Sequence, residues 1–220
     1  MLCSLNEIET EVRKAARGAR LPWGLAEEAG YAARFLSAYQ IPCLSAFLLL
    51  FDWRRDRAQE TMTPVVDAQH GWRSGGDGLC AITAGSVWQD FGYAAMMSET
   101  IELHNIIAPT LLAPFVAATT LRSAITLALH WPRVTFWFCA DRMWLAGEPE
   151  DIGCTKAAVV TIRQCTSAPS IGLACVRHWQ GVPVDDRTWS RLREYAARTY
   201  VPTSAASRLY GAGAGLLDND

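Results

Sequence analysis

Residues 125–146 read ITLALHWPRVTFWFCADRMWLA, and within them the periodicity of the chain is that of an extended backbone. From Ile125 to Leu129 the large apolar side chains occupy every second position, an alternation that is typical of a half-buried strand. Two further apolar segments, 134–139 and 143–146, flank a short polar turn and predict a β-hairpin.

More strands are predicted towards the C-terminus, at residues 157–164 and 171–178. The connection between them is short and holds no helix, so consecutive strands are expected to pair antiparallel. We therefore expect a mainly antiparallel sheet that is built from residues after about 120.

The N-terminal part of the chain carries helix signals instead. Ser4 precedes Glu7 by the spacing of a capping box, and apolar residues then recur at three- and four-residue steps until Gly18 ends the helix. A second helix is predicted after Pro22, and its small residues allow another element to approach closely. Together these segments predict a helical hairpin.

Two more apolar segments are predicted as buried helices. Cys43–Trp53 is almost continuously apolar. Leu103–Leu121 has no Asp, Glu, Lys or Arg and is long enough to cross a bilayer, but it contains His104, Asn105 and two prolines. These polar and helix-breaking residues favour a buried helix interrupted at a proline, so no membrane contact is expected. Glu99 and Glu102 are predicted to lie on one face of a helix, because they are three residues apart.

The C-terminal helix is predicted to begin at Asp185 or Asp186 and to end before Pro202, because proline cannot continue a helix. Its buried stripe consists of Trp189, Leu192, Tyr195 and Ala196. The fold class expected is α+β, with the N-terminal helical hairpin and the C-terminal helix packed on a mainly antiparallel sheet. We expect one domain over residues 1–220, with a helical part to about 120, a sheet-rich part over about 121–180 and a helix with a Gly-Ala tail over 185–220.

Composition excludes several classes of protein. The formal net charge is −2, and the arginine clusters at 13–20 and 54–57 stand among acids, so we interpret them as solvated helix faces and expect no nucleic-acid partner. The seven cysteines form no CxxC pair and their number is odd, which favours free thiols in a reducing compartment. No basic leader precedes the first helix, and a soluble cytoplasmic protein is expected.

Both ends of the chain carry motifs that resemble a bacterial family known as a conserved domain of unknown function. At the N-terminus these are Ser4-Leu5-Asn6-Glu7-Ile8-Glu9 and Trp23-Gly24-Leu25-Ala26-Glu27-Glu28; at the C-terminus they are Gly211-Ala212-Gly213-Ala214-Gly215 and Asp218-Asn219-Asp220. The resemblance implies no activity, catalytic residue or cofactor.

Candidate ligand-binding residues fall in two glycine-rich segments. Residues 57–78 are polar and end in a cluster of glycines, and so predict a long loop of the kind that often carries function. This loop supplies Arg73 and Asp77. In the C-terminal tail, alternating glycines expose backbone N–H groups that suit an anion. The residues assigned there are Arg208, Gly211, Gly213, Gly215 and Asp218.

Known nucleotide fingerprints are not matched, because no strand precedes these glycines and no helix follows them. No catalytic residue, metal ligand or cofactor is identified in the sequence. Trp23, Trp72 and Trp131, which lie beside glycine or proline in turns, are expected to line a cleft or an interface, where aromatic residues are enriched.

Two functional hypotheses follow. The first is an enzyme or enzyme-associated protein that binds a small polar or anionic metabolite where the 71–78 loop and the Gly-Ala tail converge. The second is a non-catalytic accessory or assembly protein that holds a partner subunit. Convergence of Arg73, Asp77, Arg208 and Asp218 would favour the first hypothesis, and a flat apolar patch around Trp23 would favour the second.

Overall fold

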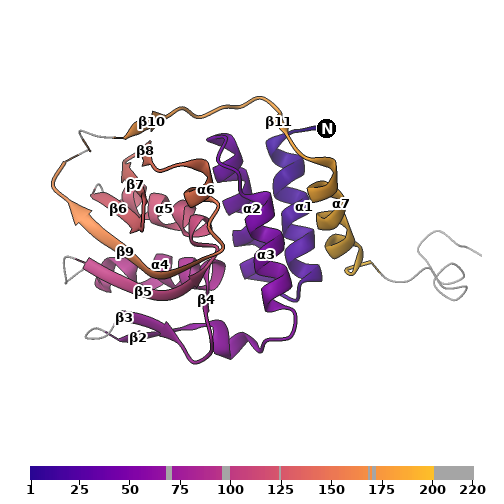
Figure 1. Cartoon of the computed structure of the whole chain (residues 1–220), viewed down its shortest axis with the longest axis horizontal. Helices are drawn as coiled ribbons and strands as arrows, with labels where there is room; N and C mark the ends of the chain where they lie inside the picture. The colour runs from indigo at the N-terminus through magenta and orange to yellow at the C-terminus, as the bar shows by residue number, and fades with distance from the viewer. Residues whose placement is uncertain (68–70, 96–99, 124, 168, 170–171, 201–220) are drawn as a thin grey trace, which may run out of the picture.

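The structure is a computed structural model that describes residues 1–67, 71–95, 100–123, 125–167, 169 and 172–200. It has a group of helices on one side and a large sheet with two covering helices on the other (Figure 1). The α+β class expected from the sequence is confirmed, with the N-terminal helices and the C-terminal helix grouped together.

Helices α1, α2, α3 and α7 form the helical group, and α1 lies between α2 and α7 (Figure 1). The capping box is present, since the Ser4 hydroxyl accepts a hydrogen bond from the Glu7 N–H while the Glu7 carboxylate accepts one from the Ser4 N–H. The Asp185 side chain caps α7 by accepting from the N–H of Thr188. The helical bounds are α1 (Leu5–Gly18), α2 (Trp23–Ala38), α3 (Leu44–Arg54), α4 (Ala81–Ala95), α5 (Ala113–Ser123), α6 (Pro149–Ile152) and α7 (Asp186–Ala197), with 3-10 turns η1 (Gln59–Met62) and η2 (Pro109–Leu112).

The sheet has nine strands in the order β10-β8-β7-β6-β9-β5-β3-β2, and β4 pairs with β5 beside this path. All neighbours are antiparallel except β3–β5 and β4–β5, which are parallel. The short strands β1 and β11 form a separate pair that joins the N-terminus to the segment before α7. The strand bounds are β1 (Leu2–Cys3), β2 (Pro64–Asp67), β3 (Gly71–Ser74), β4 (Leu79–Cys80), β5 (Thr100–Ile107), β6 (Thr126–Trp131), β7 (Val134–Cys139), β8 (Arg142–Ala146), β9 (Lys156–Cys165), β10 (Leu173–Cys175) and β11 (Val182–Pro183).

Strand register explains why one face of the sheet is buried. An apolar row crosses four strands in register, from Ile101 through Ile162 and Leu129 to Phe136, and helices α4 and α5 pack on the sheet. The adjacent row on the opposite face runs from Glu102 through polar residues of β9, β6 and β7. The period-two alternation in the sequence is therefore confirmed as a division between core and solvent.

The sheet begins earlier in the chain than expected. Four strands, β2 to β5, come from residues 64–107, so the expectation of a sheet built only after about 120 is wrong. The segment Leu103–Leu121, expected as a buried helix interrupted at a proline, starts inside β5 and continues through η2 into α5. Strand β5 lies between β3 and β9, and it alternates the buried Ile101 and Leu103 with the exposed Thr100 and Glu102, so its period is that of a strand.

The predicted loop over 57–78 contains a hairpin, with β2 and β3 paired antiparallel. Gly71 has φ of +77°, and a Cβ there would lie 2.7 Å from the Glu102 carbonyl oxygen, so the backbone needs glycine at the start of β3. Trp72 and Trp131 are each only 2% exposed, whereas Trp23 is 62% exposed. The prediction of a cleft or an interface is therefore wrong for Trp72 and Trp131, which lie in the core, and among the three only Trp23 is open to solvent.

Within the described residues, no helix combines the length and apolar character needed to cross a membrane. The predicted strand over 171–178 is shorter in the structure, where β10 covers Leu173–Cys175. The buried stripe predicted for the C-terminal helix is confirmed at all four of its positions.

Helix α1 approaches α7 so closely at Gly18 that an added Cβ would overlap the carbonyl oxygen of Tyr195. We predict that Gly18→Ala lowers the free energy of unfolding by about 2–3 kcal/mol, because the backbone of α7 must move away. Urea denaturation measures this change.

Gly24 is the matched control, since it lies in α2 and a Cβ there meets nothing within 4 Å. Gly24→Ala should leave stability unchanged or raise it by up to about 1 kcal/mol, the difference in helix propensity. Equal stability of the two variants would contradict the close packing of α1 against α7.

Candidate functional site

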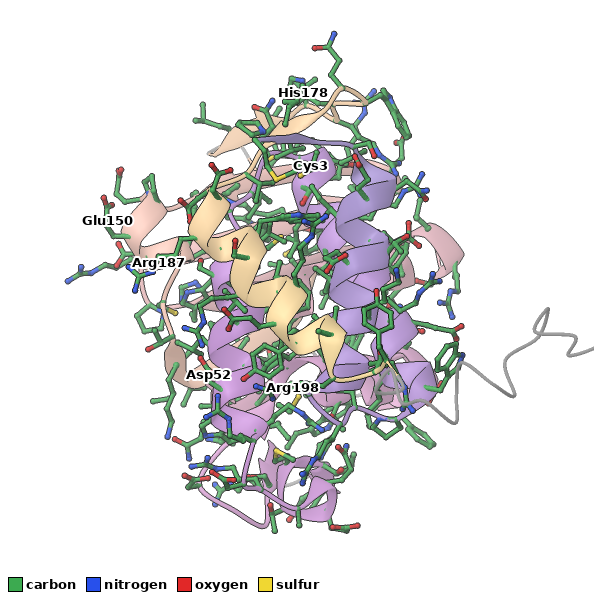
Figure 2. All side chains as sticks on the ribbon, turned by 90° about the vertical axis from the view of Figure 1, so that its right-hand side faces the viewer. Cys3, Asp52, Glu150, His178, Arg187 and Arg198 are labelled. Carbon is green, nitrogen blue, oxygen red and sulfur yellow. The ribbon has the colours of Figure 1, made fainter. Side chains whose placement is uncertain are left out.

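A cavity of about 560 Å³ lies where the C-terminal ends of α1, α3 and α7 meet. Figure 2 shows this end of α7, with Asp52 and Arg198 labelled near its last turn. We call this cavity the arginine pocket, and its lining residues are Arg17, Gly18, Ala19, Arg20, Phe51, Arg55, Asp56, Tyr195 and Arg198.

The lining carries four guanidinium groups and a single carboxylate, that of Asp56. Arg17 donates to the carbonyl oxygen of Leu21 at 2.6 Å, and Arg198 stacks on the Tyr195 ring with its guanidinium carbon 4.2 Å from the ring centroid. Within the described part of the chain, Arg17, Arg20 and Arg198 form no ion pair with a carboxylate. Among the residues that the structure describes, three cations at one cavity thus lack a carboxylate partner.

Arg20 owes its position to the way α1 ends. The N–H of Arg20 donates to the carbonyl of Arg17, and the N–H of Leu21 donates to that of Ala16, which is the Schellman arrangement. Arg20 occupies the left-handed position of this motif, with φ of +65°, where glycine is the usual residue. The left-handed backbone of Arg20, a residue that lines the arginine pocket, therefore costs about 1–2 kcal/mol of stability.

Beside the pocket, Asp52 is held by three donors. Its Oδ1 accepts from the Tyr195 hydroxyl at 2.6 Å and from Arg55 at 2.9 Å, while Oδ2 accepts from Arg191 at 2.8 Å. Because Arg55 also donates to the Tyr195 hydroxyl at 3.3 Å, two residues of the lining are fixed by one network that joins α3 to α7.

This network shifts the ionisation of its members. Partial burial of Asp52 raises its pKa, but the hydrogen bonds from Tyr195 and Arg191 and the charges of Arg191 and Arg55 outweigh that effect, so the net pKa is lowered. The pKa of Tyr195 is raised, first by burial and then by its hydrogen bond to Asp52. At neutral pH the carboxylate is charged and the phenol keeps its proton.

The site residues predicted from the sequence lie elsewhere or outside the described residues. Arg73 is exposed on β3, and Asp77 lies in the connection to β4, where its carboxylate accepts from Arg57 at 2.8 and 3.1 Å. Lys156 also donates to the Asp77 carbonyl oxygen at 3.1 Å. Asp77 therefore binds cations of the protein itself. The tail residues Arg208, Gly211, Gly213, Gly215 and Asp218 fall outside the described residues, so their convergence with Arg73 and Asp77 stays a prediction.

Sequence reasoning missed the arginine pocket because it took both arginine clusters as solvated helix faces. That interpretation is wrong for Arg54, which is 4% exposed and donates to Gln59 at 2.6 Å. The missed signal is the placement of basic residues at the ends of two separate predicted helices. Helices that end side by side bring such residues together.

Glu102, which the sequence predicts on a helix, lies on a strand instead. Glu102 and His104 lie on the same face of β5, with the His104 Nε2 3.5 Å from the Glu102 carboxylate, and Glu99 falls outside the described residues. Three or more His, Cys, Asp or Glu side chains placed to hold a metal ion occur nowhere among the described residues.

Residues 3–74 match the model of a family described as "Protein of unknown function (DUF3726)". The match confirms the resemblance to a domain of unknown function for the N-terminal motifs, spans α1, α2, α3 and the β2–β3 hairpin, and does not extend to the C-terminal motifs. Arg17, Arg20 and Arg55 lie inside the matched segment. Neither a curated protein nor a solved structure matches the chain.

The lowered pKa of Asp52 predicts a pH dependence of stability. Stability from its ionised form is complete above its ordinary pKa of about 3.9 and is lost as pH falls through the lower folded-state pKa. We predict that Asp52→Asn costs about 1–2 kcal/mol at pH 7 and that this difference shrinks in acid.

The measurement is the free energy of unfolding between pH 7 and pH 2. Asp56→Asn is the control, because the exposed Asp56 side chain makes no hydrogen bond or ion pair among the described residues. A constant difference between wild type and Asp52→Asn across this range would disprove the assignment.

Proposed function

We propose that the protein binds a small molecule with two or more carboxylate or phosphate groups in the arginine pocket. The observation that carries this proposal is the gathering of four guanidinium groups around one cavity of about 560 Å³ with one carboxylate in its lining. A volume of this size matches sites for small metabolites.

The residue type supports an oxygen anion as ligand. A guanidinium offers a planar fork of N–H donors that fits carboxylate and phosphate oxygens, and its charge persists at every physiological pH. Arg55 is already oriented by Asp52, and Arg198 by stacking on Tyr195, so part of the ordering cost is met before a ligand arrives.

The pocket supplies recognition of negative charge. Its lining, as far as the structure describes the chain, contains no histidine or cysteine that would act as a base or nucleophile near neutral pH. We accordingly favour a binding or enzyme-associated role over catalysis at this pocket.

Free thiols support a reducing compartment such as the cytoplasm for this function. All seven cysteines are free, and three of them, Cys3, Cys43 and Cys80, are buried. Burial raises the pKa of the Cys43 thiol to about 12, so this group packs as a small neutral side chain.

The alternative, an accessory protein that holds a partner subunit, has less support. Trp23 is exposed, but it donates to Glu27 at 3.1 Å and lies beneath the guanidinium of Arg17. The neighbouring cavity is lined mainly by charged residues, among them Glu9, Glu28 and Arg122. These side chains do not form a flat apolar patch around Trp23.

The test uses Arg20→Gly, which removes a cation and relieves the left-handed strain together. We predict that affinity for pyrophosphate or citrate falls about tenfold in isothermal titration, the loss of one charged hydrogen bond. Stability should rise by up to about 1 kcal/mol, because the strain relieved exceeds the added entropy of glycine.

Gln40→Gly is the matched control. Gln40 has φ of +57° and takes the same place in the Schellman motif that ends α2, but it lies outside the pocket lining. It should gain similar stability with no change in affinity. Absence of anion binding to the wild type at low ionic strength, or equal affinities in the two variants, would refute the proposal.

A further inference from the structure

A second cavity, of about 520 Å³, lies at the far end of the helical group from the arginine pocket. Figure 2 shows His178, from the chain segment over this cavity, at the opposite end of the molecule from Asp52 and Arg198. The lining residues are Tyr39, Asp141, Arg142, Met143, Trp144, Ala174, Cys175, Arg177 and Trp179. No residue lines both cavities.

Strand register forms one wall of this cavity. Trp144 of β8 is half-buried and lies between Trp137 of β7 and Ala174 of β10, the smaller of its two neighbours in the sheet. Met143, opposite Cys175, lies on the other face of the sheet and is buried. Arg142 lies one residue beyond the last pair, where the two strands part. An arginine and a tryptophan thus border the same opening.

The segment after β10 forms the other wall. It crosses the end of α2 on its way to β11 (Figure 1), and the N–H of His178 donates to the carbonyl of Ala38 at 2.6 Å. The Tyr39 hydroxyl in turn donates to the carbonyl of Asp141 at 3.4 Å. These contacts hold the segment and the β7–β8 turn against the end of α2.

This wall presents a second aromatic and arginine pair. Trp179 is 68% exposed, and the guanidinium carbon of Arg177 lies 4.3 Å from its ring centroid. A tryptophan placed in solvent leaves a large apolar surface uncovered, and cation–π stacking orients the arginine that covers one of its faces.

We infer that this cavity binds a small molecule in which a planar aromatic ring is joined to an anionic group, either a carboxylate or a phosphate. The ring stacks on Trp179 or Trp144, and the anion contacts Arg142 and Arg177. Stacking on tryptophan accepts many ring types, while the two arginines select for negative charge.

The inference is independent of the function proposed for the arginine pocket, because the two sites share no lining residue and differ in kind. The arginine pocket has no tryptophan in its lining, whereas this cavity has two. An aromatic anion is therefore expected to distinguish this site from the arginine pocket.

The experiment titrates the whole protein with indole-3-acetate and with adenosine 5′-monophosphate by calorimetry. Adenosine and inorganic phosphate serve as the separated halves of the second probe. In indole-3-acetate and adenosine 5′-monophosphate the ring and the anion are joined, and we call these the joined probes. Trp179→Leu should weaken the binding of a joined probe about tenfold or more, because it removes the exposed stacking surface and leaves the core intact. Arg142→Gln should weaken the anionic probes and leave adenosine unchanged.

Trp23→Leu is the control, since Trp23 is likewise exposed and stacked with an arginine, but lines neither cavity. Binding of only the carboxylate or only the phosphate probe, lost in Trp179→Leu, would support the site and identify its anion. Failure of both joined probes to bind, or equal affinities in Trp179→Leu and Trp23→Leu, would overturn the inference.

Discussion

The backbone contact between Gly18 of α1 and Tyr195 of α7 sets the position of the last turn of α7. Because no side chain separates the helices there, the Tyr195 hydroxyl reaches Asp52 of α3 at 2.6 Å. The same turn carries Arg198 to the edge of the cavity, opposite Arg17 and Arg20. A single missing Cβ therefore brings three helix ends, and the cations on them, around one opening.

Arginines gather at this opening for a general physical reason. The C-terminal end of a helix carries a partial negative charge, so a basic residue in the last turn stabilises the helix. Arg17 lies in the last turn of α1, and Arg55 and Arg198 are the C-cap residues of α3 and α7, so three helix ends contribute cations to a common space. Arg20 keeps a left-handed backbone where glycine would be less strained, as Gln40 does at the end of α2 outside the pocket.

The two cavities depend on different parts of the chain, and residues close to each of them, His178 for one and Arg198 for the other, lie at opposite ends of the molecule (Figure 2). The arginine pocket is formed by helices, and most of its lining falls in the segment that matches the family model. The second cavity depends on the sheet edge at β8 and β10, which lies outside that segment.

Local sequence patterns were sufficient for elements whose signals lie within a few residues of one another. The Ser4–Glu7 capping box, the β7–β8 hairpin and the buried stripe of α7 depend on such short spacings. Strand β5 was predicted as part of a helix because its alternation of exposed and buried residues, from Thr100 to Leu103, is short and is followed by an uncharged segment that continues into α5. The arginine pocket was missed for a related reason: Arg17, Arg55 and Arg198 lie far apart in the chain and meet only through helix packing. Which helix ends converge depends on close contacts such as Gly18 against Tyr195, and these exist only in the folded chain.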